Sequence, residues 1–384
     1  MAYTAAMHAL RRGFAPFLAL VALLIAVPVA SAAPLTINVG AALSLTGDAS
    51  AYGLSSRKGI DMAAAEINAG AIPGVRINVK TVDDLSTTPG AAAAFGVFVR
   101  DGVSAIMGPT LSNVALDVDP FAQATRIPVL AISNTQPGIT EIGTFVFRPA
   151  LTETYVLPQV VKTVATSTLM PKTAVVIQGS DTFAATSGPL LTSALSGNGI
   201  TVKKTELVPA GTTDFSAIAA DVKANDPDIV GISALAPEAA PLLLALRNAG
   251  YKKAVIGSNG LNSPAVVKGA GSASNGLIVG TAWAGWNDTP ENKAFIKAFK
   301  KKYKSSPDQF SATAYAYTYV LARAAKNGKT VAPDALATAL AAIQGTKNVS
   351  TLLGNFSFDV NRNGISPVLV QQVKNGKWGA FKTS

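Results

Sequence analysis

Two short polar segments carry the residue types that hold a small anion. Ser112 and Asn113 stand at the start of an expected helix, directly after an apolar strand and a Gly-Pro turn. Free N–H groups at a helix start, together with the helix dipole, favour a bound anion. Ser133, Asn134 and Thr135 follow the next apolar strand, which in a parallel sheet ends at the same edge. The two segments predict a cradle for a small anion, and we interpret that anion as a carboxylate.

The elements that must position this cradle alternate between short apolar strands and longer helical stretches. Strands are expected at 36–43, 75–82, 104–107, 173–178, 201–208, 228–232, 253–256 and 276–281. Helices are expected between them, among others at 57–69, 89–100, 157–166 and 238–248. Such alternation is typical of an α/β fold with a parallel sheet and helices on both faces. The first 32 residues have the order of a signal peptide, described below, and their removal leaves 384 − 32 = 352 residues. Because this length exceeds one comfortable core, two domains are expected.

The pattern changes after Trp286. Three helices are expected in succession, at 291–304, 311–326 and 334–343, with no strand between them. The tail from 356 to 381 has a β pattern, and Asn363-Gly364 and Asn375-Gly376 are strong turn pairs.

The first 32 residues have the order of a secretory signal peptide. Arg11 and Arg12 precede an apolar run at 14–29, and Ala30-Ser31-Ala32 is a small-residue cleavage site. A membrane anchor is the alternative, since about 17 apolar residues span a bilayer with little margin. We expect export to the periplasm, with the general and the twin-arginine routes both open.

The composition of the exported chain excludes several function classes. There is no cysteine, and the single histidine lies at position 8, so no disulfide, lipid-modified cysteine, or thiolate or imidazole metal site is expected. The net charge of the mature chain is (32 − 2) − 22 = +8. Its one lysine cluster, at 300–304, reads as a solvated helix face, so no nucleic-acid partner is expected.

Catalytic signatures are missing or incomplete. A nucleophile–histidine pair is impossible after the signal is removed, and no phosphate-binding loop or nucleophile elbow occurs. Asp83 and Asp84 are interpreted as turn and cap formers, and the segment 359–364 as a hairpin turn that lacks the glutamate of a calcium loop. We expect neither a cofactor nor a metal, and a binding protein in place of an enzyme.

As a set, these segments resemble the type I periplasmic solute-binding proteins of the leucine/isoleucine/valine class. The resemblance rests on VGAALSLTGDASAYG, GIDMAAAEINAG, VDD, IMGPTLSN, IPVLAISNT, VIQGSDTF and LLGNFSFD, in that order along the chain. It implies an α/β fold of two doubly wound parallel-sheet lobes, joined by three crossovers near 149–153, 282–286 and 355–359. The implied lobes are 33–151 with 284–356, and 152–283 with 357–384, after a signal peptide at 1–32.

The resemblance also implies roles for individual residues. On the first lobe, Ser112 and Thr135 take the ligand carboxylate, Ser133 contributes its carbonyl, and Asn113 and Asn134 flank them, while Tyr52 packs on the ligand. On the second lobe, Phe183 and Leu235 stand where the family has tyrosines. Asn259 stands where amino-acid binders carry the acid that pairs with the ligand's ammonium. Asp181 is a candidate replacement for that acid, with a solvated loop residue as the alternative, and Trp283 is a further candidate for the cleft.

Because the ammonium partner is missing at Asn259, two ligand classes stay open. One is an aliphatic or branched-chain amino acid, and the other is an aromatic or aliphatic acid without an amine. The resemblance implies a soluble, monomeric partner of an inner-membrane ABC permease with its cytoplasmic ATPase. A ligand-sensing subunit of a signalling receptor is the alternative.

Overall fold

The computed structural model describes residues 33–209 and 211–384. The predicted signal peptide at 1–32 lies outside the described residues. Residues Pro34–Ser384 form one compact unit. Within the described ranges, no helix is both long enough and apolar enough to cross a membrane.

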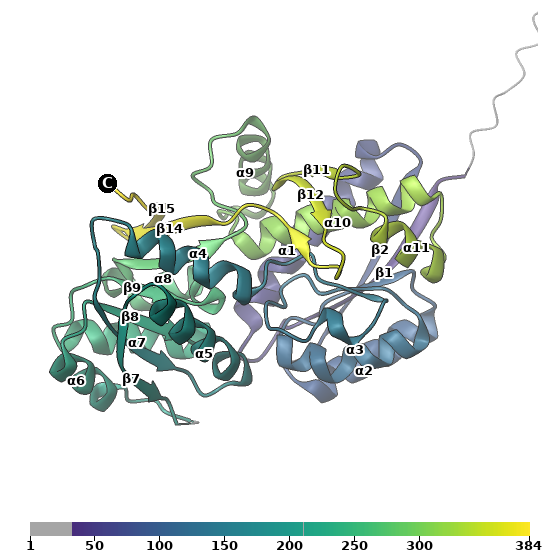
Figure 1. The fold of residues 1–384 in the computed structure, drawn as a ribbon. Helices are drawn as coiled ribbons and strands as arrows, with labels where there is room; N and C mark the ends of the chain where they lie inside the picture. The colour runs from purple at the N-terminus through teal and green to yellow at the C-terminus, as the bar shows by residue number, and fades with distance from the viewer. Residues whose placement is uncertain (1–32, 210) are drawn as a thin grey trace, which may run out of the picture. The chain divides into compact units, whose positions relative to one another are not determined.

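The first sheet has five parallel strands in the order β2-β1-β3-β4-β5. Their bounds are β1 Leu35–Leu43, β2 Val75–Asp83, β3 Ala105–Met107, β4 Val129–Leu130 and β5 Val146–Phe147. The helices that connect them are α1 Ser50–Glu66, α2 Thr88–Asp101 and α3 Ser112–Thr125, with α10 Gln309–Gly328 and α11 Pro333–Ala341 added from later in the chain. Figure 1 shows α2 and α3 on one side of this sheet and α10 and α11 on the other.

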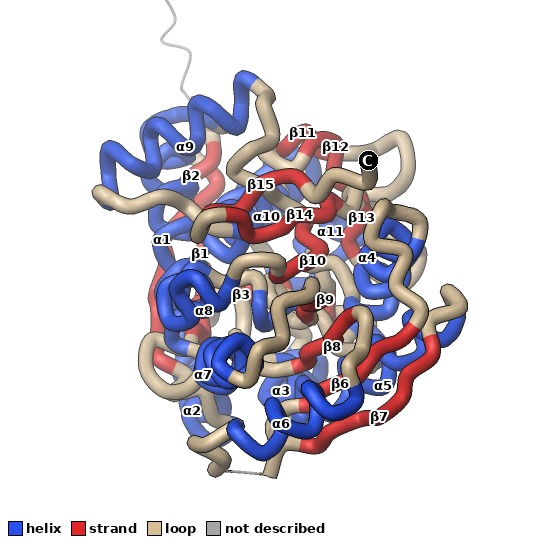
Figure 2. The backbone as a smooth tube through the Cα atoms, turned by 90° about the vertical axis from the view of Figure 1, so that its left-hand side faces the viewer, coloured by secondary structure: helices blue, strands red, loops and turns tan. Residues whose placement is uncertain are grey.

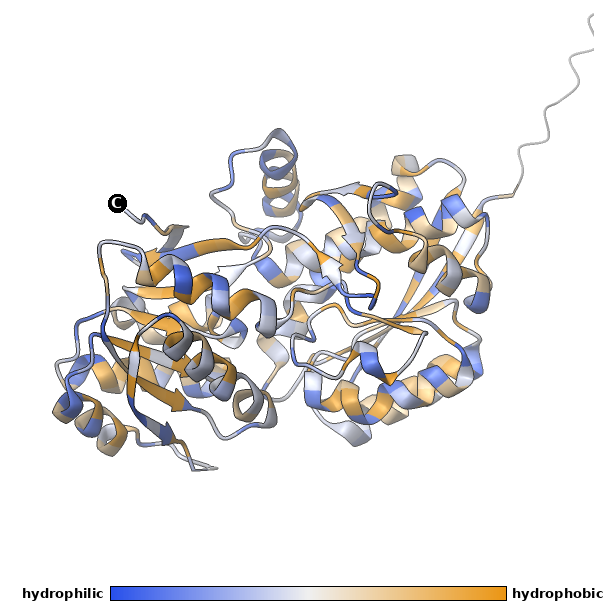
Figure 3. Ribbon diagram, viewed as in Figure 1, coloured by the Kyte–Doolittle hydropathy of each residue, from blue (hydrophilic) through white to orange (hydrophobic). Residues whose placement is uncertain are grey.

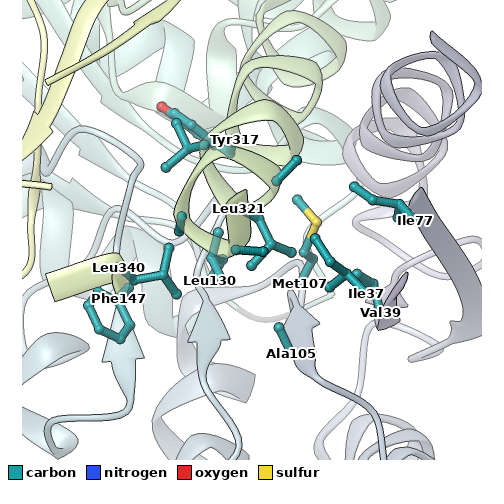
Figure 4. Close-up of a cluster of buried hydrophobic side chains, with 14 of the residues drawn as sticks. Ile37, Val39, Ile77, Ala105, Met107, Leu130, Phe147, Tyr317, Leu321 and Leu340 are labelled. Atoms are coloured by element: carbon teal, nitrogen blue, oxygen red, sulfur yellow. The ribbon is translucent and has the colours of Figure 1, made fainter. Parts of the chain in front are cut away.

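Successive strand residues of the first sheet enter different cores, as the two-residue period of a strand requires. Ile37 and Leu43 of β1 pack with α1, α10 and α11, whereas Ala42 packs with α2 and α3. Figure 4 shows the first of these cores, where Leu321 of α10 lies near Met107 of β3 and Leu130 of β4. The helix-on-both-faces arrangement expected from the sequence is confirmed for this sheet.

The second sheet has seven strands in the order β15-β14-β10-β9-β8-β6-β7. Five are parallel, namely β6 Thr173–Gln178, β7 Thr201–Leu207, β8 Ile229–Ser233, β9 Val255–Gly257 and β10 Leu277–Thr281. Two antiparallel strands, β14 Leu369–Lys374 and β15 Lys377–Ala380, complete one edge. They form a hairpin at the predicted Asn375-Gly376 pair, where both residues have positive φ.

Helices cover both faces of the second sheet as well. They are α4 Glu153–Ala165, α5 Thr182–Gly197, α6 Ser216–Asn225, α7 Ala236–Asn248 and α8 Pro264–Ala270. In Figure 2, α4 and α5 lie on one side of the strands and α7 and α8 on the other. Figure 3 shows the central strands β6, β8, β9 and β10 as mostly hydrophobic, as expected for strands buried on two faces. The edge strand β7 is mostly exposed.

Three connections join the two sheets: between β5 and α4, between β10 and α10, and before β14. The second carries α9 Pro290–Tyr303. A small antiparallel sheet of β11 Val349–Thr351, β12 Gly354–Phe358 and β13 Gly364–Ile365 precedes the third. Its Phe356 and Phe358 pack in the core of the first sheet. The remaining short helices are Ile67–Ala71, Thr140–Ile142, Asn259–Leu261 and Gly271–Ser274.

One helix begins earlier than the sequence pattern indicates. Residues 44–53 read as a loop because they are rich in serine and glycine, yet α1 begins at Ser50 and includes Tyr52 in its first turn. Gly53 and Gly59 of α1 lie directly against the backbone at Ser44 and at Ser311 of α10. This close approach requires the small residues that lower helix propensity in the sequence.

Candidate functional site

A buried carboxylate organises the carboxyl edge of the first sheet. Asp84 is 1% exposed and follows β2. Its Oδ1 accepts from the Ser44 hydroxyl at 2.6 Å and its Oδ2 from the Thr110 N–H at 3.1 Å. The Ser44 N–H donates to the Thr110 hydroxyl at 2.8 Å. The loops after β1, β2 and β3 are therefore tied together, and the start of α3 is fixed.

The two predicted cradle segments meet at this edge. Helix α3 begins at Ser112 without a side-chain cap, and the Ser112 hydroxyl accepts from the Thr135 N–H at 3.2 Å. Ser133 donates its hydroxyl to the Thr110 carbonyl at 2.8 Å. Because Ser112 caps no N–H of its own helix, donors in the first turn of α3 stay available to an anion.

Tyr52 contacts segments of the second sheet. Its hydroxyl donates to the Gly260 carbonyl at 2.8 Å and accepts from the Ala236 N–H at 2.7 Å. Burial raises the pKa of this hydroxyl well above its ordinary value. The Tyr52 ring packs on Phe310 of α10, with ring centroids 4.7 Å apart. The ring, not the hydroxyl, is therefore free to face a ligand.

Asn259 belongs to a polar network that contains a second buried carboxylate. Its N–H donates to Glu153 Oε1 at 2.7 Å, and its Oδ1 accepts from Gln309 Nε2 at 2.7 Å. Glu153 is 1% exposed, and its own N–H donates to the Thr135 carbonyl at 2.9 Å. Burial raises the pKa of the Glu153 carboxyl to about 7, and the Asn259 N–H donor opposes this rise. The other oxygen, Oε2, has no hydrogen-bond partner among the described residues.

Two cavities adjoin at this network and share Ser133, Thr135, Asn259 and Phe310 in their walls. The first is also lined by Glu153, Gln309, Thr281 and Tyr317, beside smaller apolar residues. The second is also lined by Tyr52, Ser112, Phe183 and Leu235, together with Thr110, Leu111 and Gly260. Seven of the eleven residues singled out in the sequence therefore line one or both of these two cavities: Tyr52, Ser112, Ser133, Thr135, Phe183, Leu235 and Asn259.

The four other candidates lie elsewhere. Asp181 caps α5, accepting from the Ala184 N–H at 3.0 Å, and burial raises its pKa. Trp283 donates its ring N–H to Asn292 at 2.6 Å and packs on Phe295. Asn134 is fully buried beneath the cradle and donates to the Thr110 carbonyl at 3.4 Å. Asn113 is half-buried in the first turn of α3 and lines neither cavity.

Glu153, Gln309 and Phe310 were not among the residues predicted for the site. Glu153 follows the helix cap Thr152 and reads as an ordinary acid in a first helical turn. Its burial depends on Asn259 and on α10, which are distant in the sequence. The burial of this acid near the polar end of a strand would have identified it as a site residue. Burial, however, cannot be predicted from an isolated Thr-Glu pair.

The chain also matches a known family over nearly all of its described length. The sequence model of the family described as periplasmic binding protein matches residues 36–377. The chain belongs to the periplasmic binding protein family.

Relatives of this periplasmic binding protein carry names that state what they bind. A Pseudomonas aeruginosa relative, the leucine-, isoleucine-, valine-, threonine- and alanine-binding protein, is 28% identical over 326 residues, which are 84% of this chain and 86% of the relative. The substrate-binding protein LivJ of a branched-chain amino acid transporter from Streptococcus pneumoniae, solved with isoleucine, superposes with a TM-score of 0.82 at 25% identity, over 90% of this chain and 98% of LivJ.

A third protein shares the fold of this periplasmic binding protein at lower identity. It is the solute-binding protein of an ABC transporter from R. palustris, solved with benzoate. It superposes with a TM-score of 0.79 at 21% identity, over 90% of this chain and 95% of that protein. The resemblance to the leucine/isoleucine/valine class, and the α/β fold that it implied, are confirmed.

Proposed function

We propose that this protein is the extracytoplasmic binding component of an ABC importer and carries a small carboxylate between two closing lobes. One observation carries the proposal. The two cavities at Ser133, Thr135 and Asn259 are lined from both sheets. Hydroxyl groups come from the side of the first sheet, and the side of the second sheet adds apolar side chains together with Glu153, Thr281 and Asn259. A concave, mostly apolar site with a few convergent polar groups is the form that small-molecule sites take.

The hydroxyl groups and the apolar wall divide the work of recognition. Ser112 and Thr135, with the first turn of α3, provide donors for a carboxylate. Phe183 is 5% exposed and, with Leu235, provides an apolar surface for an aliphatic or aromatic group. Both an amino acid and an amine-free acid meet this description, and the named ligands of the relatives include a carboxylate in each case.

The proposal also covers the two lobes, the export of the protein and the transporter that receives the ligand. The two predicted lobes close on the ligand, and we move their last boundary from 356/357 to the segment 366–368. Phe356 and Phe358 pack in the core of the first sheet, so the first lobe is 33–151 with 284–365 and the second is 152–283 with 369–384. Residues 1–32 direct export to the periplasm, and a permease with its cytoplasmic ATPase takes over the ligand. Binding, not catalysis, is the activity, and we expect a monomer.

A thermal-shift screen tests the proposal. The panel contains L-leucine, L-isoleucine, L-valine, their deaminated analogues, benzoate, and a neutral sugar. A ligand present at a thousand times its dissociation constant stabilises a protein by about 4 kcal/mol. We expect at least one carboxylate to raise the melting temperature and the sugar to leave it unchanged. No shift with any carboxylate would overturn the proposed function.

A further inference from the structure

The Glu153 side chain is a buried acid with unused hydrogen-bonding capacity. It is 1% exposed and lines the cavity that also contains Ser133 and Thr135. One carboxyl oxygen accepts from the Asn259 N–H, and the other finds no partner among the described residues. A buried oxygen without a donor is costly, so such a group calls for a partner that the chain itself does not supply.

Asn259 is unable to act as the missing acid. Its side chain is neutral, and its amide oxygen already accepts from Gln309 at 2.7 Å. Gln309 is in turn held by the Thr281 hydroxyl at 3.1 Å. The same Asn259 backbone, however, holds the Glu153 carboxyl in place. The available acceptor in this network is therefore not on Asn259 but on the neighbouring Glu153, whose Oε2 has no partner among the described residues.

Glu153 is also joined to the carboxylate end of the site. Its N–H donates to the Thr135 carbonyl at 2.9 Å. Glu153 is therefore hydrogen-bonded through its main chain to Thr135, the residue expected to bind the ligand carboxylate. An α-amino acid carries its carboxylate and ammonium on one carbon atom. To bind both charges, a site needs hydrogen-bond donors for the carboxylate close to an acceptor for the ammonium.

The charges around the space favour a cation. Of the residues that line the two cavities, Glu153 is the one with a charged side chain, and none is basic. An ionised carboxylate in such a place is strongly disfavoured until a cation reaches it. A ligand ammonium would satisfy the free oxygen and compensate the charge, with a charge-assisted hydrogen bond. An amine-free acid would bring a second negative charge beside the first.

We infer that Glu153 is the ammonium-binding residue of this site and that the ligand is an aliphatic α-amino acid, not an amine-free acid. This inference rests on the proposed function and decides between its two ligand classes. Glu153 thus replaces, from the start of α4, the acid that is absent at Asn259.

The inference sets the direction of a pH dependence. Burial raises the pKa of Glu153 to about 7, opposed by the Asn259 N–H. The other titratable side chains that line the same two cavities are Tyr317 of α10 and Tyr52 of α1, and no lysine or arginine in the described ranges lines either cavity. Only ionised Glu153 pairs with an ammonium, so the dissociation constant of an amino acid should be about tenfold higher at pH 6 than at pH 8. An amine-free acid should show the opposite trend.

The test is calorimetric titration of the purified protein with matched ligand pairs. The pairs are L-leucine with 4-methylpentanoate, L-isoleucine with 3-methylpentanoate, and L-valine with 3-methylbutanoate, which differ only in the amino group. The variants are Glu153→Gln and, as the matched control, Glu291→Gln, an exposed acid in the first turn of α9. Glutamine at 153 retains an acceptor for the Asn259 N–H, so folding should be preserved.

We expect wild type to prefer the amine-bearing member of a pair, and Glu153→Gln to weaken its binding about 30-fold or more, as truncating a buried charge pair does. Glu291→Gln should bind like wild type. If wild type binds the deaminated acids or benzoate better than the amino acids, or if Glu153→Gln binds its amino acid within threefold of wild type, the inference is overturned and the proposed function stands.

Two further outcomes keep the inference falsifiable. If no carboxylate binds wild type, the proposed function fails, and the inference fails with it. If Glu153→Gln does not fold, the wild-type pH series decides: an affinity for the amino acid that is equal or greater at pH 6 than at pH 8 overturns the inference.

Discussion

The Tyr52 hydroxyl donates to the carbonyl oxygen of Gly260, 2.8 Å away, although the two residues lie 208 positions apart. The donor belongs to α1, at the edge of the first sheet, and the acceptor to the segment after β9 of the second sheet. A second bond, from the Ala236 N–H to the same hydroxyl, makes this oxygen a bridge between the two sheets. The bridge is formed directly beside the cavity.

Removal of this hydroxyl should weaken ligand binding more than it weakens the fold. Tyr52→Phe keeps the ring that packs on Phe310 but leaves a buried N–H and a buried carbonyl without partners. We expect a loss of about 1–3 kcal/mol in binding free energy, measured by calorimetry with the carboxylate that gives the largest thermal shift.

Tyr251→Phe is the matched control for this bridge. The Tyr251 hydroxyl donates to the Ala254 carbonyl at 3.0 Å, within the second sheet's own structure. Its loss should lower the melting temperature and leave affinity unchanged. Equal affinity losses in Tyr52→Phe and Tyr251→Phe would show that the bridge has no special role in binding.

Gly59 and Gly96 should respond in opposite ways to the same substitution. A Cβ on Gly59 would overlap the Ser311 carbonyl of α10, whereas a Cβ on Gly96 of α2 would meet only the Arg100 side chain at 3.7 Å. Gly59→Ala should destabilise the protein by about 1–3 kcal/mol through overpacking. Gly96→Ala should stabilise it by about 0.5–1 kcal/mol through helix propensity. Urea unfolding measures both, and a stabilised Gly59→Ala would contradict the packing of α1 on α10.

Asp119 should make stability depend on pH. It is fully buried in α3, both carboxyl oxygens lack partners among the described residues, and burial raises its pKa well above the ordinary value. A raised pKa in the folded state favours folding below the ordinary carboxyl pKa, and this contribution is lost as pH rises toward the folded-state pKa. Asp119→Asn removes the ionisation. Its stability relative to wild type should therefore increase with pH by up to about 1.4 kcal/mol per unit above roughly pH 4.

The measurement is urea unfolding of both proteins at pH 4.5 and pH 7. Asp117→Asn, an exposed acid on the same helix, is the control and should show a smaller change with pH. A difference between Asp119→Asn and wild type that is identical at both pH values would rule out titration of Asp119 in this range. Only the change with pH is diagnostic, because the amide of asparagine has unpartnered groups of its own.

The local pattern was sufficient to predict most elements. The strand expected at 36–43 is β1, and the turn expected at Asn375-Gly376 forms the β14–β15 hairpin, because apolar runs and left-handed turn residues act locally. The early start of α1 at Ser50 was not predicted, because its first turn packs through Tyr52 on Phe310 of α10, more than 250 residues away, and its Gly53 is a loop-like residue that the close Ser44 backbone requires.

In the site, too, some contacts follow from the local sequence pattern, and others depend on residues that are far apart in the sequence. The approach of Ser112 to Thr135 follows from two neighbouring strands of a parallel sheet, so the sequence predicted it. Glu153 becomes a site residue only through Asn259 and Gln309, which join it from two other elements. The placement of Trp283 against Asn292 and Phe295 likewise required a helix that the local pattern could not position. Ligand contact by each named residue stays a prediction.

The cradle itself is tested most directly by calorimetric titration of Ser112→Ala, Thr135→Ala and wild type with the carboxylate that gives the largest thermal shift. Thr338→Ala, an exposed threonine of α11 bonded to its own helix, is the control. We expect one ligand per wild-type chain, a loss of about 1–3 kcal/mol in binding free energy for each of the two cradle variants, and no change for the control. Wild-type affinity in both Ser112→Ala and Thr135→Ala would contradict the cradle.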